Sequence, residues 1–150
     1  MVTFISHSEA ETIALGTAWG QAATAGWVFG LTGPLGAGKT QLVRGLARGL
    51  EVRSRVHSPT FALVHEYAGG RLPLFHLDLF RLETPEAFGS AGLEDYLFPP
   101  HGVTVIEWFE RWPGDRDRLS PQTPGALLRR VTLEVVDDTT RRIGHEDTGL

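Results

Sequence analysis

The segment of residues 33–40, Gly-Pro-Leu-Gly-Ala-Gly-Lys-Thr, constrains the fold of this chain more than any other. It follows the short apolar run of residues 27–32 and precedes apolar side chains that recur at helical spacing over residues 42–50. A short apolar run is typical of a buried strand, and the later spacing is typical of an amphipathic helix. The pattern therefore predicts a strand, a tight glycine-rich loop and a helix in direct succession.

The same segment fits the pattern G-x-x-x-x-G-K-[ST] of a P-loop, and its place between strand and helix is the context that this motif requires. Glycines let successive backbone N–H groups, together with the helix N-terminus, point at phosphate oxygens. Lys39 would then bridge the β- and γ-phosphates, and the Thr40 hydroxyl would bind Mg²⁺. The alternative interpretation is a glycine-rich turn without a ligand. The residues predicted to contact the nucleotide here are Gly33, Gly36, Ala37, Gly38, Lys39, Thr40 and Gln41.

Lys39 also stands out in the composition. Among the 14 lysines and arginines it is the single lysine, and lysine and arginine are not interchangeable at phosphate sites. The guanine-binding motif N-K-x-D of switch GTPases would need a second lysine, so this chain does not contain that motif. ATP is therefore the expected nucleotide.

Length and composition bound the remaining possibilities. A chain of 150 residues with 41% hydrophobic and 21% charged residues is expected to form one globular domain over residues 1–150. It has no cysteine, which excludes thiol nucleophiles and Cys-ligated metals and favours a cytoplasmic location. A formal net charge of −4 argues against binding nucleic acid without a partner, and no apolar run is long enough to predict a membrane helix.

Apolar spacing also predicts the other elements. A first helix is expected from Glu9 to Ala23, and residues 61–67 and 72–78 are expected to pair as an antiparallel hairpin. Further expectations are short helices after Thr84 and at residues 93–97, a buried strand at 103–108, a loop at 113–125, a half-buried strand at 131–135 and a polar tail at 139–150. The resulting fold class is α/β: a single-domain P-loop NTPase fold with a mixed sheet, in which a parallel core carries added antiparallel strands and is flanked by helices.

Two of the apolar strands end in an acidic residue, which is where a P-loop fold places the carboxylate of its metal site. Asp78 ends the run LFHLD, and Glu107 ends the run VTVIE. One carboxylate could hold the Mg²⁺ shell while the other orients the attacking water, so both are candidate metal ligands and candidate catalytic residues beside Lys39. For Asp78 the structural alternative is a carboxylate that caps the turn toward Arg81. For Glu107 it is a strand end exposed to solvent.

Four motifs, in this order, resemble those of the TsaE family. The loop GPLGAGKT is followed by VHSPTF at residues 56–61, HLDLFRL at residues 76–82 and VIEW at residues 105–108. Two departures are Phe80, where the family usually has tyrosine, and Pro34, where it usually has an acidic residue. The resemblance implies a bacterial ATPase needed for the threonylcarbamoyladenosine modification of tRNA. It further implies the TsaD and TsaB subunits as partners, with tRNA met only through their complex.

The resemblance also implies roles for single residues. Thr60 would sense the γ-phosphate and the metal, Trp108 would flank the site, Arg141 would contact the nucleotide, and Ser8 would lie near the base. The two carboxylates at the strand ends match the two functional carboxylates of the family. The alternatives are a simple turn for Thr60, a core position for Trp108 and a solvated charge for Arg141.

The predicted activity is slow, Mg²⁺-dependent ATP hydrolysis that resets the partner complex. Two other functions stay open at this point, a small-molecule P-loop kinase and an adaptor that binds ATP without cleaving it. A kinase would carry a mobile lid with arginines, for which Arg116 and Arg118 are candidates, although the favoured interpretation of that loop is a solvated charge cluster. The histidines at positions 57, 65, 76 and 101 are too scattered to predict a metal site.

Overall fold

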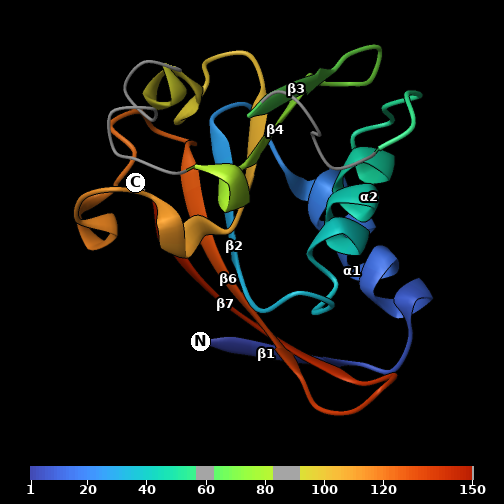
Figure 1. Ribbon diagram of the computed structural model, residues 1–150. Helices are drawn as coiled ribbons and strands as arrows, with labels where there is room; N and C mark the ends of the chain where they lie inside the picture. Colours follow the sequence, from blue (N-terminus) through green and yellow to red (C-terminus); the bar gives the residue numbers. More distant parts are fainter. Residues whose placement is uncertain (57–62, 83–91, 150) are drawn as a thin grey trace.

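The computed structural model describes residues 1–56, 63–82 and 92–149. Within these residues, seven strands form one sheet in the order β1-β7-β6-β2-β5-β4-β3 (Figure 1). The strands are β1 (Val2–Ser6), β2 (Trp27–Thr32), β3 (Val64–Tyr67), β4 (Leu74–Asp78), β5 (Val103–Glu107), β6 (Leu127–Val135) and β7 (Arg141–Gly149).

The central strands β6, β2, β5 and β4 run parallel to one another. Antiparallel strands extend the sheet on both sides. On one side β3 pairs with β4, with Val64 opposite Leu77, and on the other β7 pairs with both β6 and β1. The prediction of a mixed sheet with a parallel core and added antiparallel strands is therefore confirmed.

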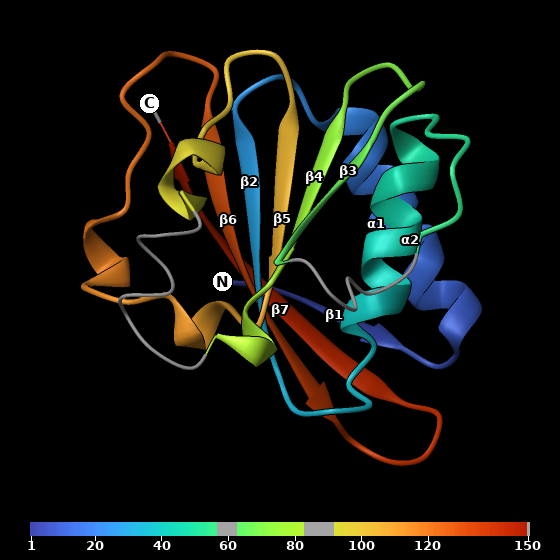
Figure 2. The same cartoon turned by 45° about the horizontal axis from the view of Figure 1, so that its top comes forward.

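The two faces of the sheet have separate hydrophobic cores. The helices α1 (Glu9–Ala22) and α2 (Lys39–Gly49) both pack on one face, over Phe29 and Leu31 (Figure 2). Val28 and Ile106 belong to the core on the other face, because successive strand residues point to opposite sides. That core also includes residues of short 3₁₀ segments. The segments that contribute are η1 (Leu79–Arg81), η2 (Leu93–Tyr96) and η3 (Phe109–Arg111), whereas a fourth, η4 (Arg116–Arg118), has no buried residue.

Glycines let α1 and α2 approach each other closely. Gly16 and Gly20 of α1 lie against Gly45 and Gly49 of α2. A Cβ built on Gly45 would lie 2.3 Å from the carbonyl oxygen of Ile13. Because that neighbour is a backbone atom, no change of side-chain rotamer could make room for a methyl group. The glycines therefore fix the spacing between α1 and α2, and with it the place where α2 begins.

We expect Gly45→Ala to lower the free energy of unfolding by about 2 kcal/mol, because the added methyl forces the two helix backbones apart. On an open helix face the same change would stabilise the protein by about 1 kcal/mol, since alanine is the better helix former. Denaturant unfolding measures the difference. The matched control is Ala18→Gly, at an exposed position of α1, which should cost no more than about 1 kcal/mol. A Gly45→Ala variant as stable as the wild type would contradict the close packing.

The C-terminal residues differ from the prediction. The sequence predicts a polar tail over residues 139–150, but Arg141–Gly149 form β7, and the strand β1 that pairs with it is not predicted at all. Of the β7 residues, Ile143 packs into the core, while cross-strand ion pairs such as Arg129–Asp147 at 2.7 Å join β7 to β6. A strand stabilised by its backbone ladder and by charged pairs carries no apolar period, so the sequence pattern misses it.

Other differences concern the ends of elements. The predicted first helix is confirmed and ends at Ala22. Of the helix predicted at residues 93–97, Leu93–Tyr96 form the 3₁₀ helix η2, and β5 ends one residue earlier than predicted, at Glu107. The loop predicted at 113–125 contains η4, and the strand predicted at 131–135 begins earlier, at Leu127. The helix expected after Thr84 and residues 61–62 of the hairpin lie outside the described residues. No helix in the described part of the chain is long and apolar enough to cross a membrane.

Candidate functional site

Residues 33–38 connect the end of β2 to the start of α2, so the predicted succession of strand, glycine-rich loop and helix is confirmed. Gly36 and Gly38 have φ angles of +78° and +101°, a left-handed conformation that would strain other residues. Gly38 is also the N-cap of α2, and no side chain caps the helix there. A Cβ on Gly33 would lie 2.6 Å from the carbonyl oxygen of Leu133. The path of this loop thus requires glycine at three positions and leaves the N-terminus of α2 without a side-chain cap.

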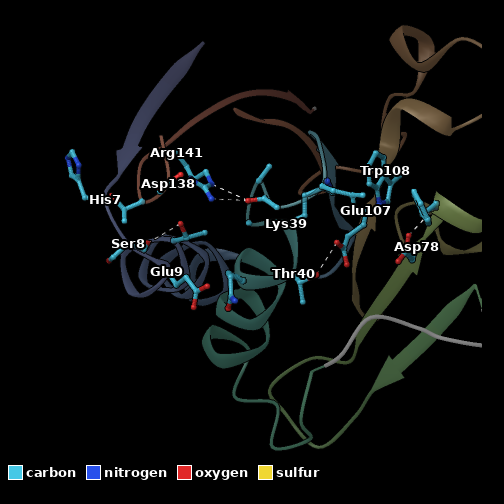
Figure 3. A pocket seen from close by; sticks show the side chains of 18 residues that line it. His7, Ser8, Glu9, Lys39, Thr40, Asp78, Glu107, Trp108, Asp138 and Arg141 are labelled. Atoms are coloured by element: carbon cyan, nitrogen blue, oxygen red, sulfur yellow. Dashed lines mark hydrogen bonds between the residues drawn. The ribbon is translucent and has the colours of Figure 1, made fainter. Parts of the chain in front are cut away.

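A cavity of about 580 Å³ lies over this loop (Figure 3). Its volume is within the range of small-molecule and cofactor sites. Gly33 is not part of the lining, and Thr60 lies outside the described residues. The predicted site residues that do line the cavity are Ser8, Gly36, Ala37, Gly38, Lys39, Thr40, Gln41, Asp78, Glu107, Trp108 and Arg141.

Lys39 is the first residue of α2, and only 5% of its surface is exposed. Its Nζ donates hydrogen bonds to the carbonyl oxygens of Gly33 and Pro34 and lies 3.9 Å from the centre of the Trp108 ring. Burial removes water from the ammonium group and lowers the pKa of Lys39 below its ordinary 10.5, while nearby carboxylates, Glu107 first, oppose this shift. The cation is therefore held at the wall of the cavity by neutral carbonyls and an aromatic face.

Asp78 and Glu107 end two neighbouring parallel strands and lie opposite each other in the sheet register. Glu107 is 3% exposed, and its Oε1 accepts a hydrogen bond from the Thr40 hydroxyl at 3.3 Å. The alternative of a solvated strand end is therefore wrong for Glu107. Asp78 lines the cavity and also caps η1, because its Oδ1 accepts a hydrogen bond from the backbone N–H of Phe80 at 3.0 Å. The capping role considered for Asp78 is thus present alongside its place in the cavity.

His76 is a residue of this region that the sequence analysis does not assign. It is fully buried in β4, and its Nε2 lies 2.6 Å from Oε2 of Glu107. A buried polar side chain needs a hydrogen-bond partner, so a histidine inside the otherwise apolar run LFHL is a signal that could have been used. The sequence could not show that the partner is Glu107, which lies on the neighbouring strand.

Trp108 follows β5 directly, in a left-handed conformation with φ of +59°. This conformation is rare for a bulky residue and marks a tight change of chain direction. The half-buried ring lies 5.0 Å from the ring of Phe80, between centroids, and borders the cavity beside Lys39. Trp108 thus lies where the family resemblance places a flanking aromatic side chain. Its contact with a nucleotide stays a prediction.

Ser8 and Arg141 lie at the other end of the cavity from the carboxylates (Figure 3). Ser8 is the N-cap of α1, and its hydroxyl accepts a hydrogen bond from the backbone N–H of Glu11 at 3.1 Å. The Arg141 guanidinium donates to the carbonyl oxygens of Gly36, at 3.0 Å from Nη2, and Asp137, at 2.6 Å. Arg141 is therefore not the solvated charge of the alternative interpretation, because it ties the β6–β7 turn to the glycine-rich loop.

Comparison with known proteins places this site in a family. A family model described as "Threonylcarbamoyl adenosine biosynthesis protein TsaE" matches residues 6–143. The chain belongs to the TsaE family. The match spans the glycine-rich loop, both carboxylate strands and Arg141, so every described site residue lies inside it.

Curated TsaE relatives agree with this assignment. The proteins named tRNA threonylcarbamoyladenosine biosynthesis protein TsaE include one from Nostoc sp., 48% identical over 73% of this chain and 68% of that protein. One from Treponema pallidum is 43% identical over 93% of this chain and 96% of that protein. The crystal structure of Bacillus subtilis YdiB superposes with a TM-score of 0.72 and 28% sequence identity, covering 98% of this chain and 84% of that one. The overall fold is thus that of a solved structure.

Proposed function

We propose that this TsaE family protein binds ATP with Mg²⁺ in the cavity over residues 33–40 and hydrolyses it slowly. The observation that carries the proposal is the convergence of Lys39, Thr40 and Glu107 on one cavity at the N-terminus of α2. A cation at a helix N-terminus attracts phosphate groups, and a glycine-rich loop before it supplies backbone N–H donors. The absence of an N-K-x-D motif from the sequence favours ATP over GTP.

The oxygen donors around the cavity fit Mg²⁺. The Thr40 hydroxyl lies 3.3 Å from Glu107, and Asp78 ends the neighbouring strand beside the same cavity. Mg²⁺ is usually held by one or two carboxylates together with water and phosphate oxygens. Thr40, Glu107 and Asp78 would hold the ion, which when bound would neutralise charge on the triphosphate.

The residues of the chain would divide the work of hydrolysis. Lys39 would turn its ammonium from the carbonyls of Gly33 and Pro34 toward phosphate oxygens. One carboxylate at the strand ends would hold the metal shell while the other orients the attacking water. Ser8 and Arg141, at the far end of the cavity, are proposed to lie on the nucleoside side. Gly36, Gly38, Ala37 and Gln41 would contact the phosphates, and the Trp108 ring would cover the phosphates.

We further propose that this activity serves the threonylcarbamoyladenosine modification of tRNA, which is the process printed in the names of the relatives. The proposed location is the cytoplasm. The proposed partners are the TsaD and TsaB subunits, with tRNA reached only through their complex. Thr60 would sense the γ-phosphate, so that hydrolysis changes the affinity for these partners. A net charge of −4 supports contact with tRNA through partners and not directly.

The kinase alternative is less well supported by the surface of the protein. Arg118 is 87% exposed and pairs with Asp115, and Arg116 donates to the carbonyl oxygen of Glu110. Neither arginine lines the cavity, so they do not form a lid over it. This arrangement favours hydrolysis over transfer to a small-molecule acceptor.

The test is a titration with Mg-ATP and Mg-GTP, followed by measurement of phosphate release with and without TsaD and TsaB. We expect tighter binding of ATP than of GTP, slow release by the chain alone and faster release with the complex. Phosphorylation of an added acceptor would favour the kinase, and binding without release in the complex would favour the adaptor. A chain that binds no nucleotide would overturn the proposal.

A further inference from the structure

A series of hydrogen bonds, two buried and one partly buried, connects the β3–β4 hairpin to the start of α2. The Nδ1 atom of His76 lies 3.3 Å from the hydroxyl of Tyr67, and its Nε2 lies 2.6 Å from Oε2 of Glu107. The other carboxylate oxygen of Glu107, Oε1, accepts from the Thr40 hydroxyl at 3.3 Å. His76 and Tyr67 are fully buried, and neither lines the cavity. Within the described part of the chain, the hydrogen bond between His76 and Glu107 joins these two residues to the site.

The chemistry of the groups gives the direction of these bonds for an ionised Glu107 and a neutral His76. A carboxylate only accepts hydrogen bonds, so the Nε2 of His76 is the donor to Glu107. In a neutral imidazole Nδ1 is then the acceptor, and the Tyr67 hydroxyl is its donor. The carboxylate thus selects the tautomer with the proton on Nε2, and the Tyr67 hydroxyl, which can donate as well as accept, bonds to the unprotonated Nδ1 and holds the ring.

We propose that His76 is a positioning residue for Glu107, and that the Tyr67 hydroxyl holds the His76 ring in place. A glutamate side chain has several rotatable bonds, and its two carboxylate oxygens are equivalent unless a neighbouring group distinguishes them. His76 holds Oε2 inside the sheet, which leaves Oε1 facing Thr40 and the cavity. This inference rests on the proposed function, because it is the orientation of Glu107 toward nucleotide and water that His76 would set.

A purely structural role is the competing explanation. His76 could simply supply a partner for a buried carboxylate, in which case its loss would weaken folding and lower nucleotide affinity and turnover together. A positioning role predicts that turnover and nucleotide affinity respond differently. The rate would fall because Glu107 loses its orientation, while binding, which Lys39 and the glycine-rich loop would dominate, would hardly change.

The experiment compares His76→Phe and His76→Gln with the wild type. Phenylalanine keeps the ring and removes both nitrogens, whereas glutamine can place an amide N–H near the former Nε2. We expect His76→Phe to lower kcat about 10-fold to 100-fold with the Kd for Mg-ATP changed less than about 3-fold, as for other outer partners. His76→Gln should restore part of the lost rate. His101→Gln, at an exposed histidine, is the matched control and should leave both values unchanged.

Two further variants test whether the effect passes through Glu107. In a Glu107→Gln background, His76→Phe should cause no additional fall in kcat, because the group it orients is already gone. Tyr67→Phe, which removes only the hydroxyl, should lower kcat by a few-fold and serves as the test if His76→Phe does not fold. A crystal structure of His76→Phe, or of Tyr67→Phe in that case, should show Glu107 turned away from Thr40.

Several results would overturn the positioning role. They are an unchanged kcat in folded His76→Phe, equal losses of kcat and affinity, and an additive loss in the Glu107→Gln background. If His76→Phe does not fold, an unchanged kcat in Tyr67→Phe has the same meaning. A wild type that binds no nucleotide would overturn the proposed function instead, and the Glu107 orientation in the variant crystal would still decide whether His76 positions it.

Discussion

Replacing Lys39 by alanine should lower the affinity for Mg-ATP by about 1,000-fold, which corresponds to about 4 kcal/mol. The reason is that the single lysine of the chain lies at the N-terminus of α2, where its ammonium would face the β- and γ-phosphates. The fold should remain, because the glycines at 36 and 38 shape the loop through their own left-handed backbone. Isothermal titration measures the affinity, and circular dichroism checks the fold.

Two controls separate the ammonium from general effects of charge. Arg48→Ala removes a cation from an exposed position at the other end of α2 and should leave the affinity unchanged. Lys39→Arg keeps the charge but replaces a compact ammonium by a planar guanidinium, and it should recover little of the binding. An undiminished affinity in a folded Lys39→Ala variant would refute the assignment of the phosphate site.

The second large effect is expected from Glu107→Gln, which should lower kcat by about 100-fold to 1,000-fold. Glutamine has nearly the same shape, so it keeps the packing of a side chain that is 3% exposed, but it cannot act as a base or as an anionic metal ligand. Single-turnover phosphate release in the presence of TsaD and TsaB measures the rate. Nucleotide titration shows whether binding survives.

Glu66→Gln is the control for this substitution, because Glu66 is exposed on β3 and does not line the cavity. Its rate should equal that of the wild type. Hydrolysis by Glu107→Gln at the wild-type rate would remove Glu107 from the mechanism and leave Asp78 as the carboxylate to test next.

The glycine-rich loop is the part of the site that a local pattern predicts best. Its strand, its glycines and its helix are adjacent in sequence, and the conformations of Gly36 and Gly38 are ones that glycine adopts without strain. The two carboxylates are also predictable, since each ends an apolar strand and parallel strands bring such ends to one edge of a sheet. None of these inferences needs a contact between distant segments.

Contacts between distant segments account for what the sequence analysis misses. The bond between Arg141 and Gly36 joins residues 105 apart, and the pair of His76 and Glu107 joins residues 31 apart. Strand β7 is missed for a related reason, because a polar segment becomes a strand only when β6 and β1 are there to pair with it. The hydrophobic period of a sequence indicates which residues are buried, but it gives no information about backbone pairing at a half-exposed edge of the sheet.

By itself, the sequence determined the chemistry of the site: one lysine in a glycine-rich loop, a hydroxyl after it and two carboxylates at strand ends. These are properties of short segments, whose backbone and side chains follow local rules. The tertiary structure decided how that chemistry is oriented. The register of neighbouring strands decides which oxygen of Glu107 faces Thr40 and which turn Arg141 ties to the loop. That register is set by the packing of the whole sheet.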